Sequence, residues 1–331
     1  MINQQISSLC RELNLGIIKE IEPVSGGLLH KMFKVNTQSG CYAIKALNPK
    51  IMMRDTAYHH TVYSEKVANI AKNNNVNALP ALTFNNQSII KHKENYYLVF
   101  EWFDGKPVNT GTIDITKSKI VGELLADIHN TDFSMIDYHC ELNDDYSLTD
   151  WQGLIDLAIG KKLAWPSQAL AGEVFNLLQK KSFESLRELN KTQVVSHRDL
   201  DQKNIMWNDN IALVIDWESA GNVNPMLELM EVALYWSTDV DKKVHEQSFK
   251  KVLSAYKSKR EITKDIITSL YAVFNGKLAW LEYNMKRSLG LESSDVDEQI
   301  LGTQEVQSTA NSIMQFNKNI KKIINWLQEY K

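Results

Sequence analysis

Three polar residues with the chemistry of a metal and proton-transfer site lie within a short stretch of the sequence. Asp199 and Asn204 follow the apolar pair at residues 194–195. Asp216 directly follows a second apolar run, residues 211–215. Because short apolar runs are typical of β-strands, we expect the three side chains at strand ends, facing one shared cleft. Their oxygens are ligands that suit Mg²⁺ alongside phosphate and water, whereas a polar hairpin turn is the structural alternative.

This stretch carries a recognisable motif. It reads SHRDLDQKN over residues 196–204 and VIDWESAG over residues 214–221. The spacing resembles the catalytic loop and the metal-binding aspartate of the protein-kinase-like fold. The resemblance implies that Asp199 is the catalytic base, which takes the proton of an attacking hydroxyl. It also implies that Asn204 and Asp216 bind Mg²⁺ at the phosphates of ATP.

Two further charged residues match the same scheme. Lys45 lies near the end of the strand pattern CYAIKAL, residues 41–47, which is similar to the V-A-I-K strand of kinases. Glu65 follows in a helical pattern, where kinase-like folds place the carboxylate that pairs with this lysine. The resemblance implies that Lys45 binds the nucleotide phosphates and that Glu65 orients it. Solvent-facing positions for both side chains are the alternative.

A glycine turn lies between two predicted strands near the N-terminus. It consists of Ser25, Gly26 and Gly27, and the second strand pattern covers residues 31–37. Adjacent glycines let a backbone approach a phosphate closely, so the turn is a candidate phosphate loop. An ordinary hairpin turn explains the same residues equally well.

A β-prone run ends at Glu101, Trp102 and Phe103, and the breaker sequence DGKP follows. We expect the hinge between two lobes there. In a kinase-like cleft the connecting segment contacts the adenine edge of the nucleotide through main-chain atoms, so these three residues are the candidates. Their aromatic side chains are equally suited to a core.

The pattern of the chain before and after this hinge indicates the fold. Residues 1–103 are rich in strand patterns, and residues 104–331 carry mostly helical stripes, as over residues 117–129 and 313–327. This pattern is consistent with what the motif resemblance implies, an α+β, two-lobed, protein-kinase-like fold. The N-terminal lobe would hold the nucleotide phosphates, and the C-terminal lobe the catalytic loop and the acceptor.

The whole chain resembles the aminoglycoside phosphotransferase and choline kinase group of small-molecule kinases. Asp216 is followed by Trp217 and Glu218 instead of Phe-Gly, and only eight residues separate it from Pro225. That interval leaves no room for the long activation segment on which a protein substrate docks. A small acceptor is therefore favoured over a protein. Asp201 stands where protein kinases usually have lysine, which leaves a phosphate contact from Lys203 open.

Composition narrows the partners further. The 331 residues carry a net charge of −3 without a long basic run, which argues against nucleic acid as the main partner. Cys10, Cys41 and Cys140 are too few and too widely spaced for a disulfide framework or a CxxC site. No apolar run reaches the roughly 18 residues of a membrane helix. We expect a cytoplasmic enzyme without a membrane partner, whose oligomeric state the sequence does not fix.

The acceptor is the least constrained part of the prediction. Acidic and aromatic side chains of the C-terminal lobe could attract a cationic amine or an aminoglycoside through charge and cation–π contact. The candidates are Asp145, Asp150, Trp280, Tyr283 and Asn284. Helical spacing puts the last three on one face and Glu282 on another.

Several functions stay open beside an aminoglycoside kinase. A housekeeping kinase of choline, ethanolamine, homoserine or a sugar fits the same motifs. A non-catalytic nucleotide-binding scaffold, or pseudokinase, would also keep the fold, although Lys45, Asp199, Asn204 and Asp216 are all intact. A protein kinase is disfavoured because the docking segment is missing.

Overall fold

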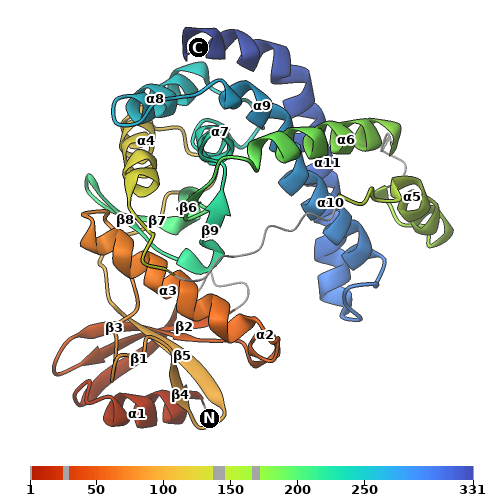
Figure 1. The fold of residues 1–331 in the computed structure, drawn as a ribbon. Coiled ribbons are helices and arrows are strands. Elements are labelled where there is room, and N and C mark those ends of the chain that lie inside the picture. Colours follow the sequence, from red (N-terminus) through yellow and green to blue (C-terminus); the bar gives the residue numbers. More distant parts are fainter. Residues whose placement is uncertain (1, 25–29, 137–145, 166–171, 331) are drawn as a thin grey trace. The chain divides into compact units, whose positions relative to one another are not determined.

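The computed structural model of the protein describes residues 2–24, 30–136, 146–165 and 172–330. It divides into two compact units, each built from three chain segments. The first unit comprises Met1–Asn109, Asp127–Cys140 and Val195–Gly221. The second comprises Thr110–Ala126, Glu141–Val194 and Asn222–Lys331. A β-rich N-terminal part and a helical C-terminal part follow one another along the chain, which confirms the predicted α+β class (Figure 1).

A five-stranded antiparallel sheet forms the centre of the first unit. Its strands are β1 (Ile18–Val24), β2 (Lys31–Thr37), β3 (Cys41–Ala46), β4 (Ile90–His92) and β5 (Asn95–Glu101), and their order across the sheet is β1-β2-β3-β5-β4. Helix α1 (Ile2–Glu12) packs on one face, where Ile6 and Leu9 join Val35, Ile44 and Val99 in a buried core. Neighbouring side chains of a strand point to opposite faces, so Lys45 lies on the face away from α1.

The other face of this sheet has its own apolar cluster. Leu47 and Leu98 are buried there, and the partly buried Met52 of α2 (Pro49–Met52) and Val62 of α3 (Ala57–Asn73) pack against them. Figure 1 shows α1 and α3 on opposite sides of the sheet. Lys45 is therefore in a layer between the sheet and α3 that is largely closed to water.

Most of the predicted catalytic stretch, Val195–Gly221, belongs to the first unit. It runs through β6 (Val194–Ser196), the short helix η2 (Gln202–Asn204), β7 (Ile205–Asn208), β8 (Ile211–Val214), the short helix η3 (Trp217–Ser219) and β9 (Gly221–Val223). Strands β7 and β8 form an antiparallel hairpin that pairs Ile205 with Val214. Backbone hydrogen bonds join it to earlier parts of the unit, at Asn77 and Leu79 through Val214 and at Lys106 through Trp207.

These hydrogen bonds explain why the compact units differ from the predicted lobes. The sequence predicts two lobes that are each one continuous segment, with a single boundary after residue 103. In the structure, the β7–β8 hairpin is hydrogen-bonded to residues that precede that boundary or lie just beyond it, so residues 195–221 join the N-terminal sheet in one compact unit.

The second unit is helical in the residues described. It contains most of α4 (Ile115–Asn130), followed by α5 (Trp151–Gly160), α6 (Gly172–Leu189), α7 (Pro225–Tyr235), α8 (Glu246–Lys257), α9 (Asp265–Ala272), α10 (Phe274–Ser288), α11 (Val296–Leu327) and the short helix η4 (Gln328–Tyr330). None of the helices in the described ranges has the length and apolar character needed to cross a bilayer.

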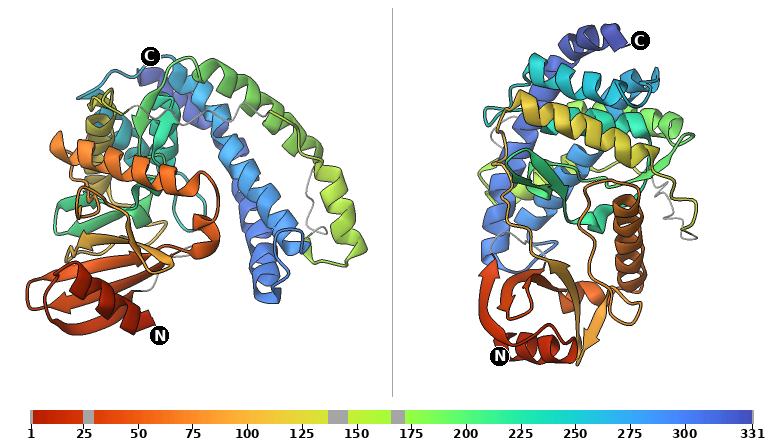
Figure 2. Two further views of the ribbon diagram at one scale, coloured as in Figure 1. Left: turned by 60° about the horizontal axis from the view of Figure 1, so that its bottom comes forward. Right: turned by 90° about the vertical axis from the view of Figure 1, so that its left-hand side faces the viewer.

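Helices α10 and α11 pack side by side along much of their length (Figures 1 and 2). Gly302 of α11 permits this approach, because a Cβ atom at this position would lie 2.8 Å from the backbone nitrogen of Ser288. The apolar stripe predicted near the C-terminus is on the buried side of α11. Its members Ile313, Phe316, Ile320, Ile323 and Leu327 are all buried.

Candidate active site

His197 stabilises the predicted catalytic loop through hydrogen bonds to the backbone of Asp199 and of Ile215. It is fully buried, and its Nδ1 accepts a hydrogen bond from the backbone N–H of Asp199 at 3.2 Å. The imidazole therefore carries its hydrogen on Nε2, which donates to the backbone oxygen of Ile215 at 3.0 Å. An edge-on contact with Trp217, at 4.8 Å between ring centroids, closes the packing around it. His197 thus ties the segment before Asp199 to the segment before Asp216.

Asn204 holds the carboxylate of Asp199. Its amide nitrogen Nδ2 donates to the backbone oxygen of Asp199 and to its Oδ2, each at 2.8 Å. Both amide hydrogens are thereby used, and the amide oxygen of the buried Asn204 is the atom left for a cation. Burial raises the pKa of Asp199 although the neighbouring Lys203 opposes the shift.

Asp216 lies at the same open end of the β7–β8 hairpin as Asn204. Asn204 immediately precedes β7 and Asp216 follows β8, and the backbone N–H of Ile215 donates to the backbone oxygen of Asn204 at 3.0 Å. Asp216 itself has a left-handed backbone, with φ 60° and ψ 60°, which aspartate tolerates better than most residues. The hairpin therefore brings the two predicted metal ligands close together.

Lys45 reaches the same place from β3. Its Nζ lies 2.8 Å from Oδ1 of Asp216 and 2.8 Å from Oε2 of Glu218. The predicted base, both predicted metal ligands and the predicted phosphate lysine are thus linked through hydrogen bonds within one unit. Such a set of donors fits a divalent cation that takes its remaining ligands from phosphate and water.

Comparisons with known proteins show the family and the fold of the chain. The sequence profile of the phosphotransferase enzyme family matches residues 20–262. The chain belongs to this phosphotransferase family. A comparison with curated protein sequences gives no match.

Solved structures similar to this phosphotransferase share its fold at low sequence identity. One is a spectinomycin phosphotransferase in complex with ADP and spectinomycin, with a TM-score of 0.68 at 14% identity over 94% of this chain and 98% of that one. An amicoumacin kinase in complex with AMP-PNP and Ca²⁺ has a TM-score of 0.61 at 9% identity, covering 94% and 95%. A choline/ethanolamine kinase family protein from Mesorhizobium loti has 0.60 at 13%, covering 97% and 98%. The predicted kinase-like fold and the resemblance to small-molecule kinases are confirmed.

The expected ion pair between Lys45 and Glu65 is wrong for this phosphotransferase. Glu65 is buried on α3, and its Oε2 accepts a hydrogen bond from the backbone N–H of Ala81 at 2.6 Å. In the described part of the chain the ammonium group of Lys45 is paired with Asp216 and Glu218 instead. Burial raises the pKa of Glu65 to about 7, against the effects of the Ala81 hydrogen bond and of Lys45.

Glu218 is a site residue that the sequence reasoning missed. Besides Lys45, its Oε2 lies 3.4 Å from Nε2 of His30, and its backbone oxygen lies 2.8 Å from Nε2 of His60. Burial alone would raise the pKa of Glu218, but the hydrogen bond from His30 and the charge of Lys45 lower it to about 2. The available signal was a carboxylate two positions after Asp216, the predicted metal ligand.

Lys203, whose role the sequence left open, lies beside the predicted base. Its Nζ is 3.4 Å from Oδ2 of Asp199 and 3.2 Å from Oδ2 of Asp201. A lysine therefore lies near the carboxylate of Asp199, the predicted base, even though Asp201 occupies the usual lysine position.

The predicted adenine contacts and the glycine turn stay predictions. The backbone N–H of Trp102 already donates to Cys41 at 3.0 Å, and the backbone oxygen of Phe103 accepts from Gly105 at 3.1 Å. Glu101 is exposed at the end of β5. The turn formed by Ser25, Gly26 and Gly27 is outside the described residues.

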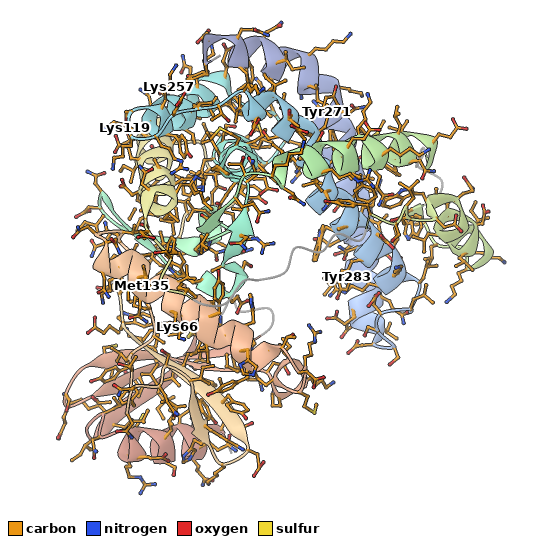
Figure 3. The ribbon with its side chains drawn as sticks, in the orientation of Figure 1. Lys66, Lys119, Met135, Lys257, Tyr271 and Tyr283 are labelled. Atoms are coloured by element: carbon orange, nitrogen blue, oxygen red, sulfur yellow. The ribbon has the colours of Figure 1, made fainter. Side chains whose placement is uncertain are left out.

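The predicted acceptor residues divide into different environments within the second unit. Asp150 is exposed and caps α5, with its Oδ1 accepting from the backbone N–H of Gly153 at 2.9 Å. Trp280 and Tyr283 form an exposed stacked pair on α10, with 5.5 Å between centroids; Tyr283 is labelled in Figure 3. Asn284 differs from them, because it is fully buried and its amide donates to the backbone oxygen of Trp280. Asp145 lies outside the described residues.

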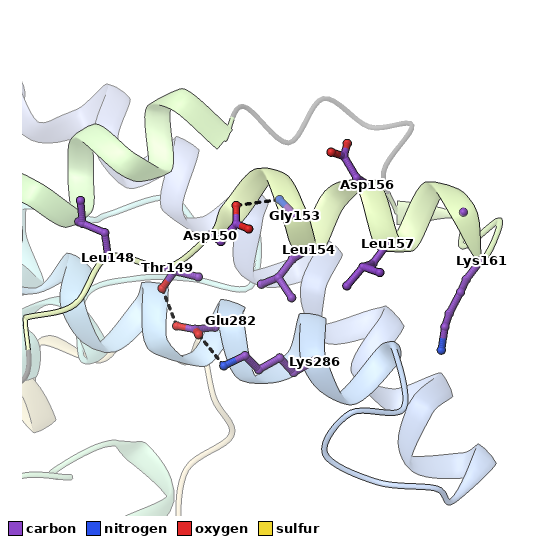
Figure 4. A pocket seen from close by; sticks show the side chains of 11 residues that line it. Leu148, Thr149, Asp150, Gly153, Leu154, Asp156, Leu157, Lys161, Glu282 and Lys286 are labelled. Atoms are coloured by element: carbon purple, nitrogen blue, oxygen red, sulfur yellow. Dashed lines mark hydrogen bonds and ion pairs between the residues drawn. The ribbon is translucent and has the colours of Figure 1, made fainter.

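A pocket of about 800 Å³ lies between α5 and α10 of this unit. Glu282, which the sequence set apart from Trp280 and Tyr283, lines it, while neither aromatic residue does. Its carboxylate accepts from Oγ1 of Thr149 at 2.6 Å and pairs with Lys286 at 2.7 Å (Figure 4). The remaining lining residues are Leu148, Asp150, Gly153, Leu154, Asp156, Leu157, Gly160 and Lys161.

Proposed function

We propose that this phosphotransferase moves the γ-phosphoryl group of ATP to a hydroxyl of a small molecule in a Mg²⁺-dependent reaction. The observation that carries the proposal is that the hydrogen-bonded pair Asp199 and Asn204 and the ion pair Lys45 and Asp216 belong to one compact unit, where the backbone N–H of Ile215 donates to the backbone oxygen of Asn204. Each of these side chains has the chemistry that phosphoryl transfer needs: a proton acceptor, two oxygen ligands and a cation for phosphate.

The roles follow from the contacts. Asp199 accepts the proton of the acceptor hydroxyl, and its raised pKa makes it a better base than a solvated carboxylate. Asn204 fixes the orientation of that carboxylate through its amide nitrogen. Lys45 binds phosphate oxygens of the nucleotide. Mg²⁺, held by the oxygens of Asn204 and Asp216, would neutralise charge on the phosphates.

For the acceptor we propose an amino-bearing alcohol, as in the aminoglycosides. Asp150 offers an exposed carboxylate, and the stacked rings of Trp280 and Tyr283 offer an exposed aromatic surface, both suited to a cationic amine. Asn284 drops out of the proposed set, since its side chain is buried and hydrogen-bonded. Choline and ethanolamine belong to the same chemical class, whereas homoserine and sugars are the neutral or zwitterionic alternatives.

The test is a coupled assay of ATP consumption with aminoglycosides, choline, ethanolamine, homoserine and simple sugars as acceptors, followed by detection of the phosphorylated product. We expect turnover with a cationic acceptor, lost on chelation of Mg²⁺ and lost in Asp199→Asn. Binding of Mg²⁺-ATP without turnover on any acceptor would favour the pseudokinase alternative. Incorporation of phosphate into peptides but not small molecules would contradict the proposed acceptor class.

A further inference from the structure

The ammonium group of Lys45 is a buried charge with two partners. Lys45 is 9% exposed, and a charge at such a position requires opposite charges beside it. One partner is Asp216, but that carboxylate is also the proposed metal ligand. The other partner, Glu218, is 2.8 Å away and has no metal-binding role in the proposed mechanism. Glu218 is therefore the carboxylate that can stay with Lys45 throughout the reaction.

Glu218 is itself held from three directions. His30 lies before β2, and its Nδ1 accepts from the backbone N–H of Asn48 at 2.9 Å, so its hydrogen is on Nε2, which faces Oε2 of Glu218 at 3.4 Å. His60 of α3 contacts the backbone oxygen of Glu218 at 2.8 Å. The side chain of His30 is only 9% exposed, whereas that of Glu218 is 39% exposed, so the contact is shielded from water on the side of the histidine. The position of Glu218 is thus set by Lys45 of β3, by His30 just before β2 and by His60 of α3.

Glu65 does not pair with Lys45 in the described structure, because its carboxylate is bound elsewhere. Its Oε2 is hydrogen-bonded to the backbone N–H of Ala81, and it makes no ion pair with Lys45 in the described structure. The two carboxylates thus have separate functions: the buried Glu65 satisfies a backbone donor, and the partly exposed Glu218 pairs with the lysine.

We propose that Glu218, held by His30, is the positioning residue for the phosphate-binding Lys45, the task that kinase-like enzymes give to the helix glutamate at the place of Glu65. The inference rests on the proposed function, because it assumes that Lys45 binds nucleotide phosphates. Neither residue touches the reacting atoms. Their effect is to keep the ammonium group aimed at the phosphates when Asp216 binds the metal ion.

The experiment compares binding of Mg²⁺-ATP with binding of adenosine, which has no phosphates, by isothermal titration calorimetry. We expect Glu218→Gln to weaken Mg²⁺-ATP binding by about tenfold or more, as removal of a charged hydrogen-bond partner does, and to leave adenosine binding unchanged. His30→Leu should weaken Mg²⁺-ATP binding in the same direction. His30→Gln keeps a donor near the position of Nε2 and should restore most of the affinity.

Matched controls separate this effect from a general loss of charge. Glu94→Gln and His59→Asn make similar changes at exposed positions of the same unit and should bind like the wild type. Thermal unfolding of each variant shows whether it is folded. If Glu218→Gln does not fold, the comparison of His30→Leu with His30→Gln decides the question.

The outcomes are distinct. A larger loss of Mg²⁺-ATP affinity in Glu65→Gln than in Glu218→Gln would overturn the inference and restore the usual pairing. Equal loss of adenosine and Mg²⁺-ATP binding would overturn it too, because the defect would not concern the phosphates. Wild-type protein that binds adenosine and Mg²⁺-ATP equally, or neither, would overturn the proposed function and the inference with it.

Discussion

Asp199 is half-buried and has a fixed orientation. The amide of Asn204 contacts both its backbone oxygen and its carboxylate, so the carboxylate keeps one orientation without any contact from substrate. A proton acceptor held in this way needs little rearrangement in the transition state, which is the main contribution a protein makes to phosphoryl transfer.

Asp199→Asn tests that role. We expect kcat to fall by about 100-fold to 10,000-fold, since the amide cannot accept the proton, while the Kd of Mg²⁺-ATP changes little. Steady-state kinetics and nucleotide titration measure the two quantities. The control is Asp201→Asn, which keeps the hydrogen bond to the backbone of Lys203 and lies two residues away. A loss confined to nucleotide affinity would contradict the role as base.

Asp216→Asn should abolish Mg²⁺-dependent turnover and leave the fold intact, because the variant removes the charge that a divalent cation requires. Turnover is measured with the acceptor found in the screen, and the fold by circular dichroism. Near-normal turnover would remove Asp216 from the metal site.

The buried Glu65 gives a prediction on stability. Its pKa of about 7 is above the unfolded value of 4.5, so the folded state favours the protonated form. The associated stability is fully present below pH 4.5 and is lost as the pH rises through about 7. Between pH 5 and pH 8, the free energy of unfolding of the wild type should therefore fall by roughly 1–3 kcal/mol relative to Glu65→Gln, which stays neutral.

Urea unfolding of both proteins at pH 5 and pH 8 measures this difference, and the contributions of all other titrating groups cancel between them. An unchanged difference would mean that Glu65 is ionised in the folded protein at both pH values.

At the scale of the element, two variants of Asp150 at the start of α5 can distinguish its role as a helix cap from its proposed role in binding the acceptor. Asp150 caps this helix through the backbone N–H of Gly153 and is also a proposed acceptor contact. Asp150→Ala should lower the free energy of unfolding by about 0.5–2 kcal/mol, as loss of an N-cap does. Asp150→Asn keeps the cap and should be nearly as stable as the wild type.

The two variants share the loss of charge, so they should raise the KM for a cationic acceptor alike. An unchanged KM in both would leave Asp150 as a helix cap alone.

Replacing either of two helix glycines by alanine should change the free energy of unfolding in opposite directions. A Cβ at Gly302 would lie 2.8 Å from the backbone of Ser288, so Gly302→Ala should destabilise the protein by about 1–3 kcal/mol. Gly276 of α10 has open space around it, so Gly276→Ala should stabilise by roughly 0.5–1 kcal/mol. Urea unfolding tests both, and equal effects would contradict the close packing of α10 on α11.

At the scale of the whole molecule, periodicity and motif spacing predicted a large part of the structure. The strand that carries Lys45, the helix that carries Glu65 and the apolar stripe of α11 are all present. These predictions succeeded because each depends on neighbouring residues in the chain, where strand alternation and helical spacing are directly visible.

The predictions that failed or were missed depend on contacts between distant segments. The lysine partner could not be chosen from spacing alone, since Glu218 is 173 residues from Lys45 and Glu65 only twenty. The competing hydrogen bond from Ala81 to Glu65 has no signature in the sequence. Likewise, the pairing of Ala78 with Val214, which joins the β7–β8 hairpin to the segment after α3, involves apolar residues without a motif.

The segments of the first unit are synthesised at widely separated times, because they are far apart in the sequence. Its sheet strands are complete by Glu101, but the hairpin that carries Asn204 and Asp216 belongs to Val195–Gly221. A ribosome must therefore translate as far as Gly221 before this unit has all of its segments. Until then the nascent chain lacks the hairpin that completes the unit, and a fragment that stops at Asn109 would lack it permanently.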